Sequence, residues 1–340
     1  MSQTKSAYLE SIALLDSQLK QAYDEARKIK FAKEYSKINK IVTCGMGGSQ
    51  LGVDLIKHLF SQELSLPIIQ VKNYDLPKFI DRQTLVFLLS YSGTTEEVLN
   101  NLRIIRKNKA RAIIITSGGA LAKISKSKKI PAYIFKPIFN PSAQPRLGTG
   151  YLIGSMVAIL RRLRILKVSD NQVAELIKAA KLSFLEYKNL NQIQSLSQKL
   201  VNKIPVIVAS EFLLGNAHIM ANQINESAKQ TAIYFAIPEL NHHLLEGLTF
   251  PKGLKSHWHF LFFTSKDYNP RNQIRHQLTQ KILSLQNIAF NQIKFRGDKI
   301  NQAMEMLVFG SLLSYQMSKL NKVDPNKIPW VDYLKAQLKK

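Results

Sequence analysis

Short runs of apolar residues alternate along this chain with segments whose apolar positions follow helical spacing. Between residues 6 and 29 the apolar side chains recur at steps of three and four, which predicts an amphipathic helix. From residue 40 onward, continuous apolar runs each precede a helical stretch. The expected strands lie in KIVTC, LPIIQVK, TLVFLL, ARAIIIT and PAYIFKP. Because these strands are short, continuously apolar and separated by helices, they indicate a parallel, doubly wound sheet.

The same alternation returns in the second half of the chain. Residues 148–163 are apolar over most of their length, which is typical of a largely buried helix. The polar stretch Lys167–Asn171 follows, where Ser169 and Asp170 are suitable helix caps. Further strands are expected in IPVIVAS, HWHFLFFT and NIAFNQIKF, and further helices in NAHIMANQINESAKQ, AMEMLVFGSLLSYQMSKL and WVDYLKAQL.

We therefore expect an α/β protein with two subdomains, each a mostly parallel, doubly wound sheet flanked by helices. Residues 1–166 form the first subdomain, with a leading helix inside 1–36, and residues 167–340 form the second. The length of 340 residues suits two domains of roughly 150 residues each.

Composition and charge narrow the possible partners. Lys and Arg number 48 against 23 Asp and Glu, so the formal net charge is +25. The lysines are scattered, Lys339 and Lys340 being the nearest thing to a basic tail, and no nucleic-acid-binding motif is visible. The charge therefore indicates a solvated basic surface, or a broad field that attracts small anions, and no specific nucleic-acid partner.

The cysteine, histidine and apolar residues argue against a disulfide-bonded, metal-binding or membrane-spanning protein. Cys44 is the single cysteine and is expected to be a small core residue, so no disulfide forms within the chain. His257 and His259 could share one face of a strand, but no third ligand has metal-site spacing, so we expect no metal. No apolar run of about 18 residues and no signal peptide are visible, which favours a cytoplasmic protein without a membrane partner.

Two turns between an expected strand and helix are suited to binding phosphate. The first is Gly45–Ser49, where glycines let the backbone approach an anion at a helix N-terminus. The turn does not match the dinucleotide-binding motif GxGxxG, because position 50 is Gln. The second, Ser90–Thr95, places four hydroxyls at the start of a helix. A Thr cap followed by acidic residues would explain part of this second pattern without a ligand.

These turns belong to a longer set of motifs. CGMGGSQLG, LSYSGTTEEVL and ITSGG together resemble the sugar isomerase (SIS) domain. QPRLGTGY, NQINESAKQ, IPELNHH and DPNKIPWVDYLKAQL extend the resemblance to the bifunctional phosphoglucose/phosphomannose isomerase family, from about residue 40 to the C-terminus. The resemblance implies two SIS-like subdomains and a phosphate site made by Gly48, Ser49, Ser90, Ser92 and Thr95.

The resemblance also implies the roles of an aldose–ketose isomerase. Glu226 matches the base that moves a proton between C1 and C2, and Arg146 matches the cation that stabilises the enediolate. His242 and Lys335 match the groups that open the sugar ring. The familiar family motif is Asn-His-Asn, whereas this chain has His243, so both histidines stay open and His242 is favoured.

The implied reaction interconverts glucose 6-phosphate and mannose 6-phosphate with fructose 6-phosphate through a cis-enediolate, without metal or organic cofactor. In the family the histidine comes from the neighbouring subunit, so a homodimer is expected. A non-catalytic SIS-domain sensor and a glucosamine-phosphate synthase-like isomerase are the alternatives. A sensor usually carries a DNA-binding module, and only one amphipathic helix fits before residue 40.

Overall fold

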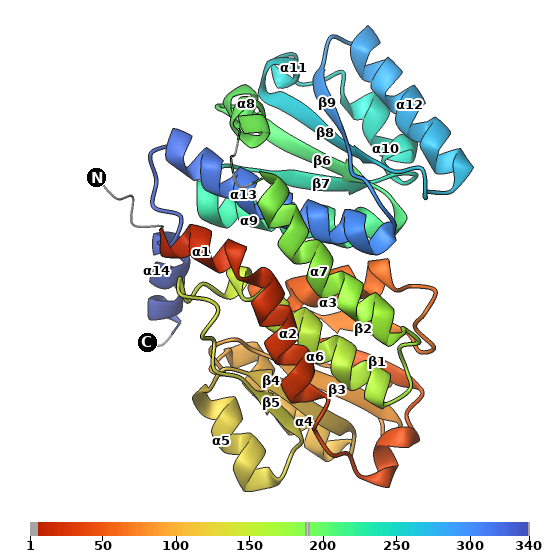
Figure 1. The fold of residues 1–340 in the computed structure, drawn as a ribbon, viewed down its shortest axis with the longest axis vertical. Coiled ribbons are helices and arrows are strands. Elements are labelled where there is room, and N and C mark those ends of the chain that lie inside the picture. The colour runs from red at the N-terminus through yellow and green to blue at the C-terminus, as the bar shows by residue number, and fades with distance from the viewer. Residues whose placement is uncertain (1–5, 188, 190, 339–340) are drawn as a thin grey trace.

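The fold consists of two parallel β-sheets separated by a thick layer of helices (Figure 1). A computed structural model describes residues 6–187, 189 and 191–338. Lys339 and Lys340 lie outside the described residues. Both sheets are entirely parallel, so the expected α/β class with two doubly wound sheets is confirmed.

The first sheet contains the five strands that the apolar runs predict. They are β1 (Lys40–Cys44), β2 (Ile68–Val71), β3 (Thr84–Leu89), β4 (Arg111–Thr116) and β5 (Ala132–Ile134). Their spatial order is β2-β1-β3-β4-β5, so the chain reverses direction across the sheet between β1 and β3. The helices that follow β1, β3 and β4 are α3 (Gly48–Leu59), α4 (Glu96–Lys107) and α5 (Gly119–Lys128). α4 and α5 cover one face with apolar side chains.

The second sheet has the order β7-β6-β8-β9. Its strands are β6 (Ile204–Ala209), β7 (Ile233–Ala236), β8 (Trp258–Thr264) and β9 (Ala289–Lys294). The edge strand β7 is not among the predicted strands; it is only four residues long, and none of its residues is buried. The helices of this half are α8 (Asn191–Leu200), α9 (Leu214–Gln223), α10 (Leu240–Gly247), α11 (Leu254–His257), α12 (Pro270–Leu285) and α13 (Lys299–Leu320).

One hydrophobic core fills the space between the sheets. Its helical layer combines α3, α9 and α13 with α1 (Ala7–Ala13), α2 (Leu15–Ala26), α6 (Thr149–Arg162) and α7 (Asp170–Tyr187). The predicted leading helix is therefore present but divides at Leu14, and α6 and α13 are buried along most of their length, as expected. Because both halves share this layer, the N-terminal helix contacts elements of the second half directly.

The segment chosen as the boundary between the subdomains begins a helix as its residues predict. The Ser169 hydroxyl accepts a hydrogen bond from the Gln172 amide at 3.2 Å, and the Gln172 side chain accepts one from the Ser169 amide at 2.8 Å. This reciprocal pair is a capping box, and it starts α7. The boundary at residues 166 and 167 itself stays a prediction.

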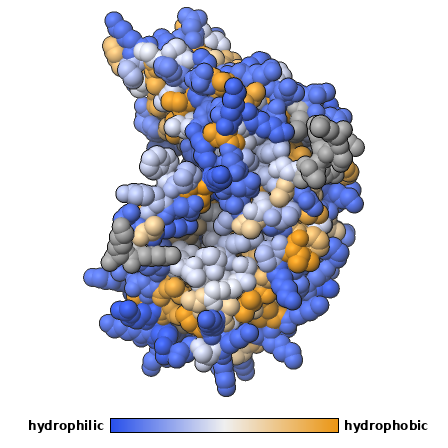
Figure 2. Space-filling model, turned by 90° about the vertical axis from the view of Figure 1, so that its left-hand side faces the viewer, coloured by the Kyte–Doolittle hydropathy of each residue, from blue (hydrophilic) through white to orange (hydrophobic). Residues whose placement is uncertain are grey.

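The last helix, α14 (Pro329–Gln337), packs differently from the others. None of its side chains is buried, and Figure 1 places it at the side of the molecule near α1. The space-filling view from that side is largely hydrophilic and is hollowed between the two halves (Figure 2). Within the described residues, no helix is long and apolar enough to cross a membrane.

The crossing of α3 and α9 can be tested through Gly215. A β-carbon on Gly215 would lie 2.3 Å from the Asp54 carbonyl oxygen, so the two helices touch through their backbones. We expect Gly215→Ala to lower stability by about 1–3 kcal/mol, measured by thermal unfolding, because the helices must separate. Gly247→Ala in α10 is the matched control, since nothing lies within 4 Å of its β-carbon position. Equal stability of the two variants would contradict the close crossing.

Candidate active site

The two predicted phosphate turns lie side by side at the carboxyl edge of the first sheet. Cys44 of β1 pairs with Leu88 of β3, so the segments that follow these strands emerge next to each other. The Ser49 hydroxyl accepts a hydrogen bond from the Tyr91 amide at 3.1 Å and joins the two turns directly. This edge lies where the strand order reverses, which is the usual ligand position in an open α/β sheet.

The first turn needs glycine for two separate reasons. Gly47 has a φ of +47°, in the left-handed region that glycine adopts at little cost. A β-carbon on Gly48 would lie 2.9 Å from the Arg146 amide nitrogen. The turn therefore rests directly on the backbone of the Arg146 segment, and no side chain caps the α3 helix that it begins.

The second turn gathers hydroxyl groups in front of an uncapped helix. The Ser90 and Thr95 hydroxyls lie 2.6 Å apart, and the Ser92 hydroxyl lies 3.0 Å from that of Thr94. Thr95 occupies the N-cap position of α4, yet its side chain accepts no hydrogen bond from the helix amides. A simple Thr cap therefore does not account for this pattern, and the first amides of α4 are without a side-chain cap.

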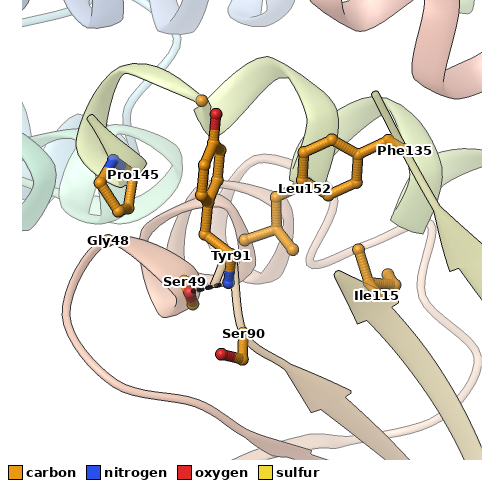
Figure 3. Close-up of a pocket in the computed structure, with 9 residues that line it drawn as sticks. Gly48, Ser49, Ser90, Tyr91, Ile115, Phe135, Pro145 and Leu152 are labelled. Carbon is orange, nitrogen blue, oxygen red and sulfur yellow. Dashed lines mark hydrogen bonds between the residues drawn. The ribbon is translucent and has the colours of Figure 1, made fainter. Parts of the chain in front are cut away.

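A small pocket opens between these turns and α6 (Figure 3). It is lined by Gly48, Ser49, Ser90, Tyr91, Ile115, Phe135, Pro145, Gly148 and Leu152. Its wall includes the Tyr91 ring, which stands between Pro145 and Leu152 in this view. The hydroxyls of Ser49 and Ser90 lie at one end, and apolar side chains fill the other.

Arg146 and Glu226 form an ion pair although 80 residues separate them. Arg146 Nη1 lies 3.1 Å from Glu226 Oε2. The Arg146 side chain is 1% exposed, whereas that of Glu226 is 32% exposed. The guanidinium thus supports the carboxylate from inside the protein, and the carboxylate faces the surface.

Neutral acceptors complete the surroundings of the Arg146 guanidinium. Its Nη1 also donates to Gln144 Oε1 at 2.9 Å, its Nε donates to the Ser227 hydroxyl at 3.0 Å, and its Nη2 donates to the Pro325 carbonyl. A buried cation is tolerated when its donors are satisfied in this way. Gln144, Ser227 and Pro325 lie within motifs of the sequence, but no pattern there predicts their contact with Arg146.

The helix predicted for the segment of Glu226 is not a regular α-helix at that residue. α9 ends at Gln223, and Ile224–Ala228 form one turn of π-helix. Lys229 ends that turn with a φ of +53°, and its Nζ donates to the Glu226 carbonyl oxygen at 2.5 Å. Burial and the nearby Arg146 charge lower the pKa of Lys229. Single π turns are frequent at functional sites, because they turn a side chain out of helical register.

Comparison with known proteins agrees with these features. A model of the SIS domain matches residues 34–134, and a model described as the bacterial phospho-glucose isomerase C-terminal SIS domain matches residues 189–338. A bifunctional phosphoglucose/phosphomannose isomerase of Caldicellulosiruptor bescii is 28% identical over 97% of this chain and 98% of its own. One from Thermoplasma volcanium is 30% identical over 92% of this chain and 96% of its own.

This chain belongs to the bifunctional phosphoglucose/phosphomannose isomerase family. The solved structures that resemble it support the fold. The C-terminal domain of glucosamine-fructose-6-phosphate aminotransferase from Francisella tularensis superposes with a TM-score of 0.73 at 15% identity. The superposition covers 96% of this chain and 99% of that domain.

His242 and Lys335, which the family motifs predict as site residues, lie apart from the ion pair of Arg146 and Glu226. His242 is exposed on α10, a helix that packs against the face of the second sheet opposite to α9. Lys335 is exposed on α14. Among the described residues, no hydrogen bond joins either side chain to Glu226 or Arg146. The neighbouring His243 is exposed as well, and its ring lies 6.0 Å from that of Phe235.

The corresponding turn of the second sheet carries an acidic side chain. Glu211 follows β6 with a φ of +47°, as Gly47 follows β1. The Glu211 carboxylate accepts hydrogen bonds of 2.7 Å from the Asn269 amide and from Asn272 Nδ2, at the start of α12. An internal carboxylate therefore occupies these donors at the start of α12.

The remaining candidates have structural roles. His259 is buried in β8 and lies 2.8 Å from Asn291 Oδ1, while His257 ends α11 and is exposed, so the two do not share a strand face. The described residues contain no cluster of three or more potential metal ligands. Cys44 is buried, and burial raises the pKa of its thiol to about 12.

The role of the hydroxyl groups of the second turn can be tested by measuring phosphate binding. We expect Thr95→Val to weaken the binding of inorganic phosphate by about tenfold, because a charge-assisted hydrogen bond is lost while the side-chain volume is kept. Affinity is measured from the rise of the unfolding temperature with phosphate concentration. Thr94→Val in the same turn is the control and should bind normally. The phosphate site is wrong if both variants bind like the wild type.

Proposed function

We propose that this chain is an aldose–ketose isomerase that interconverts glucose 6-phosphate and mannose 6-phosphate with fructose 6-phosphate. The observation that carries the proposal is the contact between the buried Arg146 and the partly exposed Glu226, directly behind the phosphate turn at Gly48. A base beside a fixed positive charge, next to an anion site, suits proton transfer on a sugar phosphate. Membership of the family supports the same reaction.

The proposed reaction begins with binding of the phosphate group. Gly48, Ser49, Ser90, Ser92 and Thr95 surround it with hydroxyls and helix amides. The Ser49 hydroxyl oxygen accepts the hydrogen bond from the Tyr91 amide, so its own proton remains available to donate to the phosphate. The phosphate then fixes the sugar so that its first two carbons reach Glu226.

Ring opening and proton transfer follow. We assign ring opening to His242 together with Lys335, which move a proton to or from the ring oxygen. Glu226 removes the proton from C2 of the aldose, and the negative charge develops on the enediolate oxygens. Glu226 then delivers the proton to C1 while the hydroxyl proton of O2 passes to O1, and the ketose forms. The positive charge of the Arg146 guanidinium favours the enediolate. No step requires a metal or an organic cofactor.

A homodimer is part of this proposal, because His242 and Glu226 belong to opposite faces of the second sheet. In a dimer, His242 of one subunit would complete the site of the other. Exposed apolar side chains of α14 and of Leu338, directly after it, support an assembly: Trp330, Tyr333, Leu334 and Leu338 are each more than half exposed. We also propose a cytoplasmic location, with which a single buried cysteine agrees.

The two alternatives lack comparable support. A non-catalytic sensor would not need a carboxylate held by a buried arginine in front of its ligand. A glucosamine-forming isomerase would consume ammonia, and its product would contain nitrogen. Adding ammonia or glutamine to fructose 6-phosphate and testing for an amino sugar distinguishes it from the proposed enzyme.

The assignment of the base is tested with Glu226→Gln. We expect kcat to fall by roughly 10²–10⁴-fold with little change in KM, because the amide cannot accept the proton but keeps the shape of the side chain. Both directions are followed in coupled assays with glucose 6-phosphate, mannose 6-phosphate and fructose 6-phosphate. Glu175→Gln, on the surface of α7, controls for loss of a carboxylate. Near-normal turnover of the Glu226 variant would remove it from the mechanism.

The shared site is tested by combining inactive subunits. Glu226→Gln and His242→Ala are co-expressed with different tags, and the mixed dimer is purified through both tags. One of its two sites then contains both native residues, so we expect about half of the wild-type activity per dimer. His243→Ala alone should remain active. A mixed dimer as inactive as its parents would place His242 outside the partner's site.

A further inference from the structure

A tyrosine of the first described helix reaches the centre of the proposed active site. Tyr8 of α1 is completely buried, and its hydroxyl forms a hydrogen bond with the hydroxyl of Ser227, 219 residues further along the chain. Sequence periodicity assigns Tyr8 only to the apolar face of a helix. Its phenol oxygen nevertheless lies next to the π turn that carries Glu226.

Ser227 connects this tyrosine to the site cation. Its hydroxyl accepts the hydrogen bond from Arg146 Nε at 3.0 Å, and it is itself 0% exposed. The Ser227 oxygen therefore lies between the phenol of Tyr8 and the guanidinium of Arg146. Because Ser227 directly follows Glu226, a change in its position also moves the backbone of Glu226.

Packing holds the Tyr8 ring in one place. The ring stacks on Tyr315 of α13 with centroids 5.5 Å apart and an interplanar angle of 12°. The Arg146 Cζ atom lies 6.0 Å from the Tyr8 ring centroid. Tyr8 thus approaches Arg146 with its ring and Ser227 with its hydroxyl, and neither group is free to turn away.

The orientation of the guanidinium depends on this contact. Arg146 is a planar fork, so fixing Nε and Nη2 determines where Nη1 points. Ser227 fixes Nε, the Pro325 carbonyl fixes Nη2, and Nη1 then faces the Glu226 carboxylate at 3.1 Å. Loss of the Nε anchor would let the fork rotate and would leave a buried donor without a partner.

We propose that Tyr8 and Ser227 are positioning residues for the proton-transfer step, in which the Tyr8 hydroxyl holds Ser227 and Ser227 holds Arg146 against Glu226. The inference rests on the proposed role of Glu226 as the base. It gives α1 a function in the reaction, because this helix supplies the outermost link of the network. Neither residue touches the substrate, so both act through Arg146 and Glu226.

The inference is tested with Tyr8→Phe in the full-length protein. Phenylalanine keeps the ring that stacks on Tyr315 and removes only the hydroxyl. We expect kcat for fructose 6-phosphate to fall about tenfold while KM stays within about twofold, because the lost hydrogen bond affects the transition state and not the phosphate site. With glucose 6-phosphate deuterated at C2, the isotope effect on kcat should increase, since proton transfer becomes slower than the other steps.

A matched control separates positioning from general stability. Tyr187→Phe also removes a hydroxyl that forms a hydrogen bond, here 2.7 Å to Glu305 and distant in the fold from Arg146. It should lower the unfolding temperature without changing kcat or the isotope effect. Ser227→Ala interrupts the same network from the other side and should act like Tyr8→Phe. The double variant should be no slower than the slower single variant, because both changes remove one connection.

The possible outcomes separate this inference from the proposed function. If the wild type does not isomerise either aldose phosphate, or if Glu226→Gln is fully active, the proposed function fails and the positioning roles fail with it. If those two measurements agree with the proposal but Tyr8→Phe and Ser227→Ala match Tyr187→Phe in kcat and isotope effect, the positioning inference alone is overturned. A selective loss of kcat in both variants supports it.

Discussion

The burial of the Arg146 guanidinium is the constraint on which the rest of this structure depends. A cation with 1% exposure loses its hydration and must recover that free energy from fixed acceptors. Those acceptors come from segments far apart in the chain: Gln144, Glu226, Ser227 and Pro325. Satisfying one side chain therefore requires the two halves and the segment before α14 to assemble correctly. The same contacts that stabilise the junction also place a carboxylate at its surface.

The two sheets show how one architecture can serve two purposes. Each sheet places a residue with a φ of +47° after the strand next to its point of reversal. In the first sheet this residue is Gly47, and the neighbouring turn presents hydroxyls and uncapped amides. In the second sheet it is Glu211, whose carboxylate accepts the hydrogen bonds there. The second half also supplies the π turn that carries Glu226.

Sequence patterns predicted the strands and turns whose structure depends on residues close together in the chain. β3 is buried at every position and therefore reads as a continuous apolar run, and the turns beside it follow from glycine and hydroxyl residues at a strand end. The short edge strand β7 was not predicted, although its four residues are apolar; it is short, and none of its residues is buried. The π turn at Glu226 was missed because it differs from an α-helix by a hydrogen-bonding register, which composition does not encode. Tyr8 lies on the apolar face of the predicted leading helix and is buried, but the partner of its hydroxyl depends on a tertiary contact across 219 residues.

The positive charges of the chain lie in two different environments, the solvated surface and the buried site of Arg146. Most of the 48 basic residues contribute at the surface, where salt screens their attraction for a phosphorylated sugar. Arg146 lies in a low-dielectric interior, where a charge has a longer reach, and in the proposed mechanism water there would not have to reorganise as the enediolate forms. Lysine could not replace it there, because an ammonium group has three donors and no planar fork to serve separate acceptors at once. Arg146 faces Glu226 at 3.1 Å, and in the proposed mechanism its charge favours the enediolate. A network that holds the guanidinium still, through Ser227 and Tyr8, would keep that charge in place without touching the substrate.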